Sequence, residues 1–150
     1  MISSSPPEVL FSPDPFTLSE ERDTFKVTAI VYELGDDCLV ILSGGTRLHI
    51  GAVGMAQVRP SLRDPQKTSA TSSVFTYLGH KEDVVAKAMS EEIARKAGKN
   101  TVVAAGIHWD ALSDKDITSI TAICRELTNR IVSRISSPSS QPDIRLPASK

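Results

Sequence analysis

The sequence predicts a single α+β domain in which a mainly antiparallel sheet carries two helices on one face, in the order ββββαβα. Apolar residues alternate in the first third of the chain, and short glycine-containing turns separate the apolar segments that follow. Two later segments carry apolar residues at three- and four-residue spacing, which is typical of amphipathic helices. A length of 150 residues suits one domain with its own core.

Both ends of the chain are rich in proline and serine. Segments of this composition contain too few apolar residues to form a packed core. We therefore expect a disordered N-terminal extension over residues 1–22, a folded domain over 23–135, and a disordered C-terminal tail over 136–150.

The first three predicted strands follow one another closely. Apolar and polar residues alternate over 24–34, as in a half-buried strand. A turn at 35–37 leads to a short apolar strand over 38–42, and a second turn at 44–46 leads to a strand over 47–58. Because the connections are so short, we expect these strands to pair antiparallel.

The middle of the chain predicts a long loop, a fourth strand and a helix. The polar segment 59–72 is long for a hairpin loop, and loops of this length are usually functional or mobile. A strand is expected over 73–78. An apolar stripe then predicts a helix over 81–97, with Gly98 as its stop.

The last two elements are a strand and a long helix. The continuous apolar run 101–107 predicts a central strand covered on both faces. Ser113 and Asp116 resemble a capping box, with aspartate in place of the usual glutamate. Apolar residues at helical spacing follow as far as Ile131 and predict a second amphipathic helix.

Composition and charge exclude several classes of partner. The formal net charge of −1 gives no reason to expect nucleic acid, and no apolar run approaches the ~20 residues of a membrane span. Residues 1–15 lack the basic start and apolar stretch of a secretory signal. Cys38 and Cys124 both fall among apolar residues, and buried free thiols suit a reducing cytosol. We therefore expect a cytoplasmic protein.

The three histidines of the chain indicate a functional site. His49, His80 and His108 each lie within two residues of a glycine and at the edge of a predicted element. Chemistry gathers at such edges, and glycine lets a backbone approach a ligand closely. We expect the three to meet at one end of the sheet, where neutral imidazoles would suit Zn²⁺ or a similar ion. The alternative is three unrelated histidines with ordinary hydrogen bonds.

Three further features could serve a ligand. His80 and Lys81 begin the predicted helix, where free N–H groups and the helix dipole favour a phosphate, although an ordinary helix start is the alternative. Gly44 and Gly45 could cradle an anion or form only a turn. Trp109 could stack on a flat ring or belong to the core.

Catalysis is not indicated by the sequence. Gly-x-Ser-x-Gly is absent, and no cysteine lies near a histidine along the chain. Asp110 could orient the imidazole of His108, although neighbouring side chains at a strand exit usually point apart.

An ordered set of short motifs resembles the prenylated-flavin chaperone family, typified by the small D subunit of bacterial gallate decarboxylase. The motifs lie at 44–45, 48–53, 78–83 and 102–108, and they include all three histidines. The resemblance covers about 25–135, which is nearly the whole predicted domain.

The resemblance implies a non-catalytic protein that binds prenylated FMN, or FMN, and supplies or matures it for a UbiD-type decarboxylase. It also implies a fold similar to proteasome-assembly chaperones and a homodimer. The implied ligand-site residues are His49, Gly51, His80, Lys81, His108, Trp109, Gly44 and Gly45. Two alternatives remain open: an assembly chaperone that acts through protein contacts alone, and a small metal-dependent enzyme that uses the three histidines.

Overall fold

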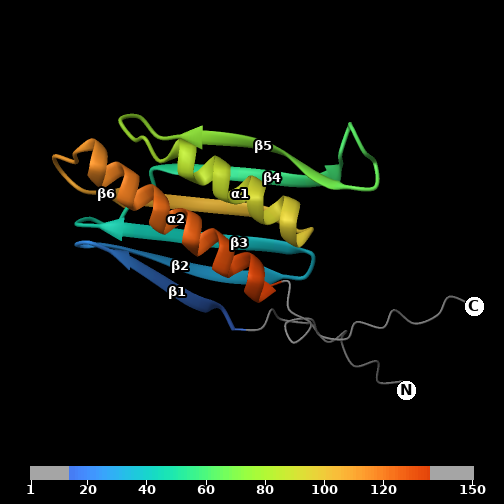
Figure 1. Cartoon of the computed structure of the whole chain (residues 1–150), viewed down its shortest axis with the longest axis horizontal. Helices are drawn as coiled ribbons and strands as arrows, with labels where there is room; N and C mark the ends of the chain where they lie inside the picture. The colour runs from blue at the N-terminus through green and yellow to red at the C-terminus, as the bar shows by residue number, and fades with distance from the viewer. Residues whose placement is uncertain (1–13, 136–150) are drawn as a thin grey trace, which may run out of the picture.

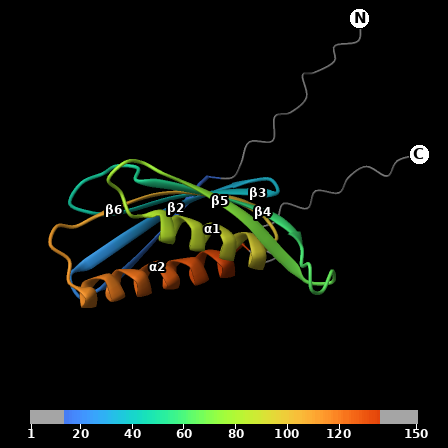
Figure 2. The same ribbon diagram turned by 90° about the horizontal axis from the view of Figure 1, so that it is seen from above.

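The computed structural model describes residues 14–135, which form one six-stranded mixed sheet with two helices against a single face (Figure 1). Figure 2 shows both helices on the same side of the sheet. The predicted α+β class is confirmed. The elements in chain order are β1 (Phe16–Arg22), β2 (Phe25–Leu34), β3 (Asp37–Gly45), β4 (Ala52–Pro60), β5 (Thr68–Thr76), α1 (Asp83–Ala97), β6 (Asn100–His108) and α2 (Asp114–Ile135).

The strand order is β1-β2-β3-β6-β4-β5, so that β6 lies between two strands that are consecutive in the chain. β6 runs parallel to β3 and antiparallel to β4, and the other pairs are antiparallel. The expectation that the strand after the turn at 44–46 pairs with its predecessor was wrong. The segment 46–51 carries the chain past the position of one strand, and β6 fills that position. The central place predicted for the 101–107 strand is confirmed.

Several predicted boundaries need correction. β1 lies inside the extension that was expected to be disordered, because Phe16 and Leu18 pack against the core while their neighbours face solvent. The element order is therefore βββββαβα. β4 and β5 extend into the expected long loop, so that only 61–67 connects them. The predicted disorder over 1–13 and 136–150 lies outside the described residues.

The core lies between the helices and the face of the sheet that they cover. α1 buries Met89 and Ile93, and α2 buries Leu127 and Ile131 on its apolar stripe. The predicted capping box of α2 is confirmed, because the backbone N–H of Ser113 donates to the Asp116 carboxylate and the backbone N–H of Asp116 donates to the Ser113 hydroxyl. The helices thus occupy nearly the expected segments.

Within residues 14–135, no helix covers the face of the sheet opposite α1 and α2, and we call it the open face (Figure 2). The prediction that the 101–107 strand is covered on both faces was therefore wrong. Val103 and Ala105 are fully buried under the helices, whereas Val102 and Ala104 on the open face are only half-buried. The segment 101–107 is therefore continuously apolar although helices cover only one of its two faces.

The two cysteines are buried free thiols, as predicted. Burial raises the pKa of Cys38 and of Cys124 to about 12, so both remain protonated at neutral pH. Among residues 14–135, no helix is long and apolar enough to cross a membrane.

Candidate functional site

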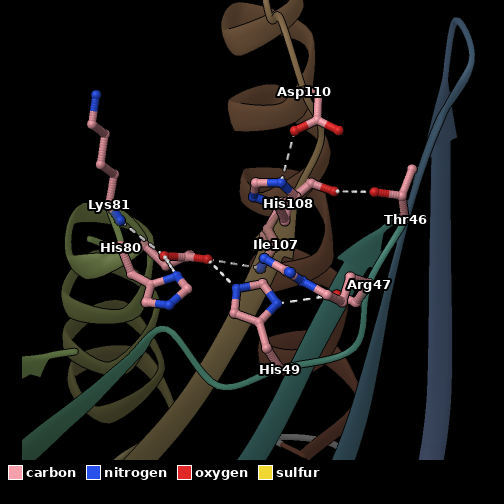
Figure 3. Close-up of polar contacts among 9 residues, drawn as sticks. Thr46, Arg47, His49, His80, Lys81, Ile107, His108 and Asp110 are labelled. Carbon is pink, nitrogen blue, oxygen red and sulfur yellow. Dashed lines mark hydrogen bonds and ion pairs between the residues drawn. The ribbon is translucent and has the colours of Figure 1, made fainter. Parts of the chain in front are cut away.

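The three histidines gather at one end of the sheet, each from a different segment (Figure 3). His49 lies in the segment 46–51 between β3 and β4, His80 lies before α1, and His108 ends β6. The rings of His49 and His80 are stacked with their centroids 4.8 Å apart. The ring of His108 stands edge-on to that of His49 at 6.1 Å. The expected convergence of the three histidines is therefore observed, and the alternative of three unrelated histidines is not.

A buried carboxylate, which the sequence did not single out, holds this cluster together. Glu82 directly precedes α1, and its side chain is only 8% exposed. Its Oε1 accepts hydrogen bonds from His49 Nε2 at 2.7 Å and from the Ile107 backbone N–H at 3.2 Å. Its Oε2 accepts the backbone N–H of Lys81 at 2.9 Å and lies 3.7 Å from His80 Nδ1. The carboxylate thereby joins three chain segments.

Glu82 is ionised at neutral pH although it is buried. Burial alone would raise its pKa, but hydrogen bonds from the His49 ring and from the backbone N–H groups of Ile107 and Lys81 together lower it. The carboxylate therefore supplies a fixed negative charge against the stacked imidazoles.

His49 is held at both ring nitrogens by groups that only accept hydrogen bonds. Nε2 faces the Glu82 carboxylate, and Nδ1 lies 3.0 Å from the carbonyl oxygen of Arg47. Both ring nitrogens are therefore engaged within the protein, and the two acceptors fix the orientation of the His49 ring.

Two glycines make the close approach of these segments possible. A Cβ on Gly51 would lie 2.3 Å from a carboxylate oxygen of Glu82, and a Cβ on Gly106 would lie 1.8 Å from the carbonyl oxygen of His49. Both distances are well below any van der Waals contact. Gly51 thus admits the buried carboxylate, and Gly106 lets the segment 46–51 cross over β6.

His108 occupies the solvent side of the cluster. Its Nε2 lies 3.1 Å from Asp110, so the orienting role considered for Asp110 has a geometric basis, although that carboxylate is 88% exposed. Its carbonyl oxygen accepts the backbone N–H of Thr46 at 3.0 Å, which closes the end of β3 onto the end of β6.

The other predicted site residues lie next to the end of β6, and they are Gly44, Gly45 and Trp109. The two glycines pair in parallel with the end of β6, and a Cβ on Gly45 would lie 1.8 Å from the His108 carbonyl oxygen. Trp109 packs edge-on against Phe25, with ring centroids 5.0 Å apart, and is half-buried against the core. The expected turn at Gly44–Gly45 is therefore the end of a strand, and Gly45 packs tightly against the backbone of His108.

The start of α1 is already provided with negative charge. Glu82 and Asp83 lie at its first turn, where acidic groups complement the positive end of the helix dipole. Lys81 is exposed and projects away from the other labelled side chains in Figure 3. An anion that approached the start of α1 would therefore contact the side chains of Lys81 and His80 and not the backbone N–H groups of the helix.

The cluster also has the donor set of a metal site. One ligand atom each from His49, His80 and Glu82 lies within 4.8 Å of the others. Two imidazoles and a carboxylate suit Zn²⁺ and related divalent ions, with a further position left for another ligand. To bind an ion through Nε2, His49 would have to give up its hydrogen bond to Glu82.

Two surface hollows lie away from this site. One, of about 290 Å³, is bordered by the ends of β4 and β5, and the other, of about 380 Å³, lies between β1 and α2. Neither is lined by a residue of the histidine cluster. We therefore place the candidate site by its chemistry and not by the depth of a hollow.

Comparison with known proteins gives two matches. Residues 21–136 match the family described as the prenylated flavin chaperone LpdD-like domain. The chain is also similar to Protein LpdD of Lactiplantibacillus plantarum, with 25% identity over 117 residues, which cover 78% of this chain and 82% of that protein. Both matches span the strands and helices that build the histidine cluster.

Proposed function

The chain belongs to the prenylated flavin chaperone LpdD-like family, and on this premise we propose that it binds prenylated FMN at the histidine cluster and delivers it to a UbiD-type decarboxylase. In this proposal, the protein holds the cofactor without transforming it. Plain FMN, which shares the phosphate and the ring system, is the weaker ligand. The protein acts in the cytoplasm as a homodimer.

The observation that carries the proposal is a cluster of imidazoles with an adjacent lysine, which lies beside exposed apolar side chains. His49 is held at both ring nitrogens, and Lys81 is exposed next to His80. On the loops that carry these residues, Leu48 and Leu78 are almost fully exposed. Prenylated FMN has the matching character, because an anionic phosphate is joined to a flat, largely apolar ring system.

We assign the phosphate and the ring system of the ligand to different residues of the site according to charge. The phosphate contacts Lys81 and His80, because charge-assisted hydrogen bonds are the strong ones and the helix start is already matched by Glu82. The ring system lies towards His108 and the apolar loop residues. Gly51 contributes by admitting Glu82, and Gly44, Gly45 and Trp109 contribute by supporting His108.

The same geometry supports binding without turnover. A general base needs a free lone pair, and both ring nitrogens of His49 face acceptors. Glu82 is buried and engaged by three donors, so it is held as a structural anion. In this state the two groups orient the site and do not exchange protons with a ligand.

A titration with prenylated FMN and with FMN, followed by Trp109 fluorescence, tests the proposal. We expect tighter binding of the prenylated form, and a loss of ~1–3 kcal/mol of binding free energy in each of His80→Ala and Lys81→Ala. Lys96→Ala is the matched control, because Lys96 lies at the other end of α1 in an exposed ion pair with Glu92. Affinities unchanged by the first two substitutions would contradict the assigned phosphate contact.

A second candidate function, a metal-dependent activity, is favoured by the donor set of His49, His80 and Glu82. It predicts about one equivalent of tightly held Zn²⁺ or Mn²⁺ per chain, lost in each single alanine variant of these residues. Elemental analysis of the purified protein before and after dialysis against a chelator measures this directly. Metal-independent flavin binding would leave the first proposal as the better account.

A further inference from the structure

The open face of the sheet carries a row of apolar side chains across five strands. In the pairing register this row is formed by Ile30, Ile41, Ala104, Val53 and Phe75. Ile41 is 37% exposed and Phe75 is 67% exposed. The row therefore presents large apolar side chains to solvent in a single copy of the chain.

A second row lies beside the first and has the same character. Its members are Tyr32, Leu39, Val102 and Met55, of which Met55 is 58% exposed. Neither row contains a charged residue, although charged residues make up 23% of the chain. Contiguous apolar surface that lacks charge and includes aromatic residues and methionine is typical of the centre of a protein interface.

We propose that a second copy of this chain packs its open face against this one and, in doing so, completes the wall of the histidine site. The two uncharged rows suit a second copy, because identical surfaces that meet across a twofold axis would otherwise bring like charges together at the centre of the contact. The net charge of −1 also leaves little repulsion between copies. The part of the proposal that concerns ligand binding rests on the proposed function.

The area of the open face matches what a stable dimer needs. Strands lie about 4.8 Å apart and rise about 3.3 Å per residue, so six strands of about nine residues present roughly 800–900 Å². Stable complexes bury about 800 Å² on each partner. Two such sheets would stack with their strands within about 30° of each other, as in a β-sandwich.

The apolar surface continues from the open face to the histidines. Phe75 contacts Tyr77 edge-on with ring centroids 5.6 Å apart, and the Tyr77 backbone N–H donates to the Gly51 carbonyl oxygen at 2.8 Å. Tyr77 and Ile50, which both adjoin this bond, are each about half exposed. The loop that carries His49 therefore borders the proposed interface.

The segment that carries His49 also lies on the same side of the sheet. In β6, Gly106 follows the alternation that places Val102 and Ala104 on the open face, and the backbone of His49 crosses directly over it. A sheet packed on the open face would meet this crossing segment. The partner copy would thus enclose a site that a single copy leaves open, where the side chains of His80 and His108 are 28% and 35% exposed.

The test compares the oligomeric state of the full-length protein with that of Met55→Glu and Phe75→Glu, by analytical ultracentrifugation. We expect a wild-type dimer, and a dimer dissociation constant raised about 100-fold or more in each variant, because each would bury an unpaired charge twice. Ile117→Glu is the matched control, since Ile117 is 51% exposed on α2 and away from the open face. Circular dichroism checks that each variant is folded. A monomeric wild type, or variants as dimeric as the control, would overturn the proposal.

Titration with prenylated FMN separates this proposal from the proposed function. Weaker binding in the two monomeric variants, with the control unchanged, supports a site completed by the second copy. Binding by the monomeric variants as tight as that of wild type would overturn the role of the second copy and leave the proposed function standing. A dimer that binds no prenylated FMN would reject the proposed function and, with it, the completed site, while the dimer surface itself would stand.

Discussion

Replacing Glu82 by alanine is expected to lower the free energy of unfolding by about 2–4 kcal/mol. The substitution leaves His49 Nε2 and the backbone N–H of Ile107 without their acceptor in a partly buried place. Each unsatisfied buried donor costs about 1–3 kcal/mol. The third donor, the backbone N–H of Lys81, belongs to an exposed residue and can turn to water, so it adds little. Two donors, each in the lower half of that range (about 1–2 kcal/mol), give the stated magnitude.

Glu82→Gln is expected to cost less, about 1–2 kcal/mol. The amide keeps one oxygen as an acceptor, but its NH₂ group must then face a donor, because all three partners of Glu82 donate. The loss of the negative charge also removes the charge-assisted bond to His49. Comparison of the two variants therefore separates the loss of stability caused by removing the charge from the loss caused by removing the side chain.

Urea denaturation at neutral pH measures both effects. Glu92→Ala is the control on the same helix, because Glu92 makes only partly exposed ion pairs with Arg95 and Lys96. Exposed pairs of this kind contribute about 0.3–0.5 kcal/mol each. If Glu82→Ala and Glu92→Ala proved equally stable, the central position of the Glu82 carboxylate would be refuted.

The pH dependence of the same variants gives a second check. The pKa of Glu82 is lowered in the folded protein from its usual 4.5, so the folded state binds its proton less readily than the unfolded state does. The stabilisation is therefore complete above that value and is lost as the pH falls through the lowered folded-state pKa. The stability difference between wild type and Glu82→Gln should accordingly narrow below about pH 4.5.

Three other outcomes are expected. Gly106→Ala should cost about 1–3 kcal/mol by overpacking and should shift the NMR signals of the His49 ring, because the added Cβ meets the His49 carbonyl; unchanged signals would contradict the tight crossing. Ile120→Ala should lower stability by about 2–4 kcal/mol in a denaturation experiment as a core truncation, and flavin affinity should not change. Cys38 and Cys124 should react slowly with a thiol reagent in the native protein and rapidly in urea, since burial raises both thiol pKa values to about 12; fast native labelling would show that they are accessible.

The helices and the first long strand could be predicted because their signals are local. The apolar stripe of α2 and its capping box lie within one continuous segment, and the alternation of β2 fixes its buried face without knowledge of its neighbours. The order of the strands could not be predicted in this way. The insertion of β6 between β3 and β4 depends on contacts between residues more than forty positions apart along the chain. β1 escaped prediction because its few apolar residues are preceded by prolines.

The candidate site was partly visible in the sequence. Each histidine lies near a glycine at an element edge, and this pattern predicted that the three meet. Gly51 and Gly106 are needed there because a Cβ at either position would clash with the segment that crosses it. Glu82 gave no such signal, since it stands in a charged run at a helix start, where acidic residues are usual and normally solvated. Its role depends on the backbone of Ile107, which no local pattern connects with it.

The place of β6 in the sheet also determines when the histidine cluster can form. In the part of the chain that the structure describes, β3 and β4 do not pair with each other, and β6 is the strand that joins the β1-β2-β3 half to the β4-β5 half. During synthesis, both halves and α1 leave the ribosome before residues 100–108 do, so they have no shared strand on which to assemble. His49 and Glu82 are brought into register only when Ile107 arrives, and the non-local pairing that this requires is intrinsically slow. A nascent chain that lacks β6 therefore has both residues of the Glu82–His49 contact but no means of holding them together, and the histidine cluster forms only with the last strand.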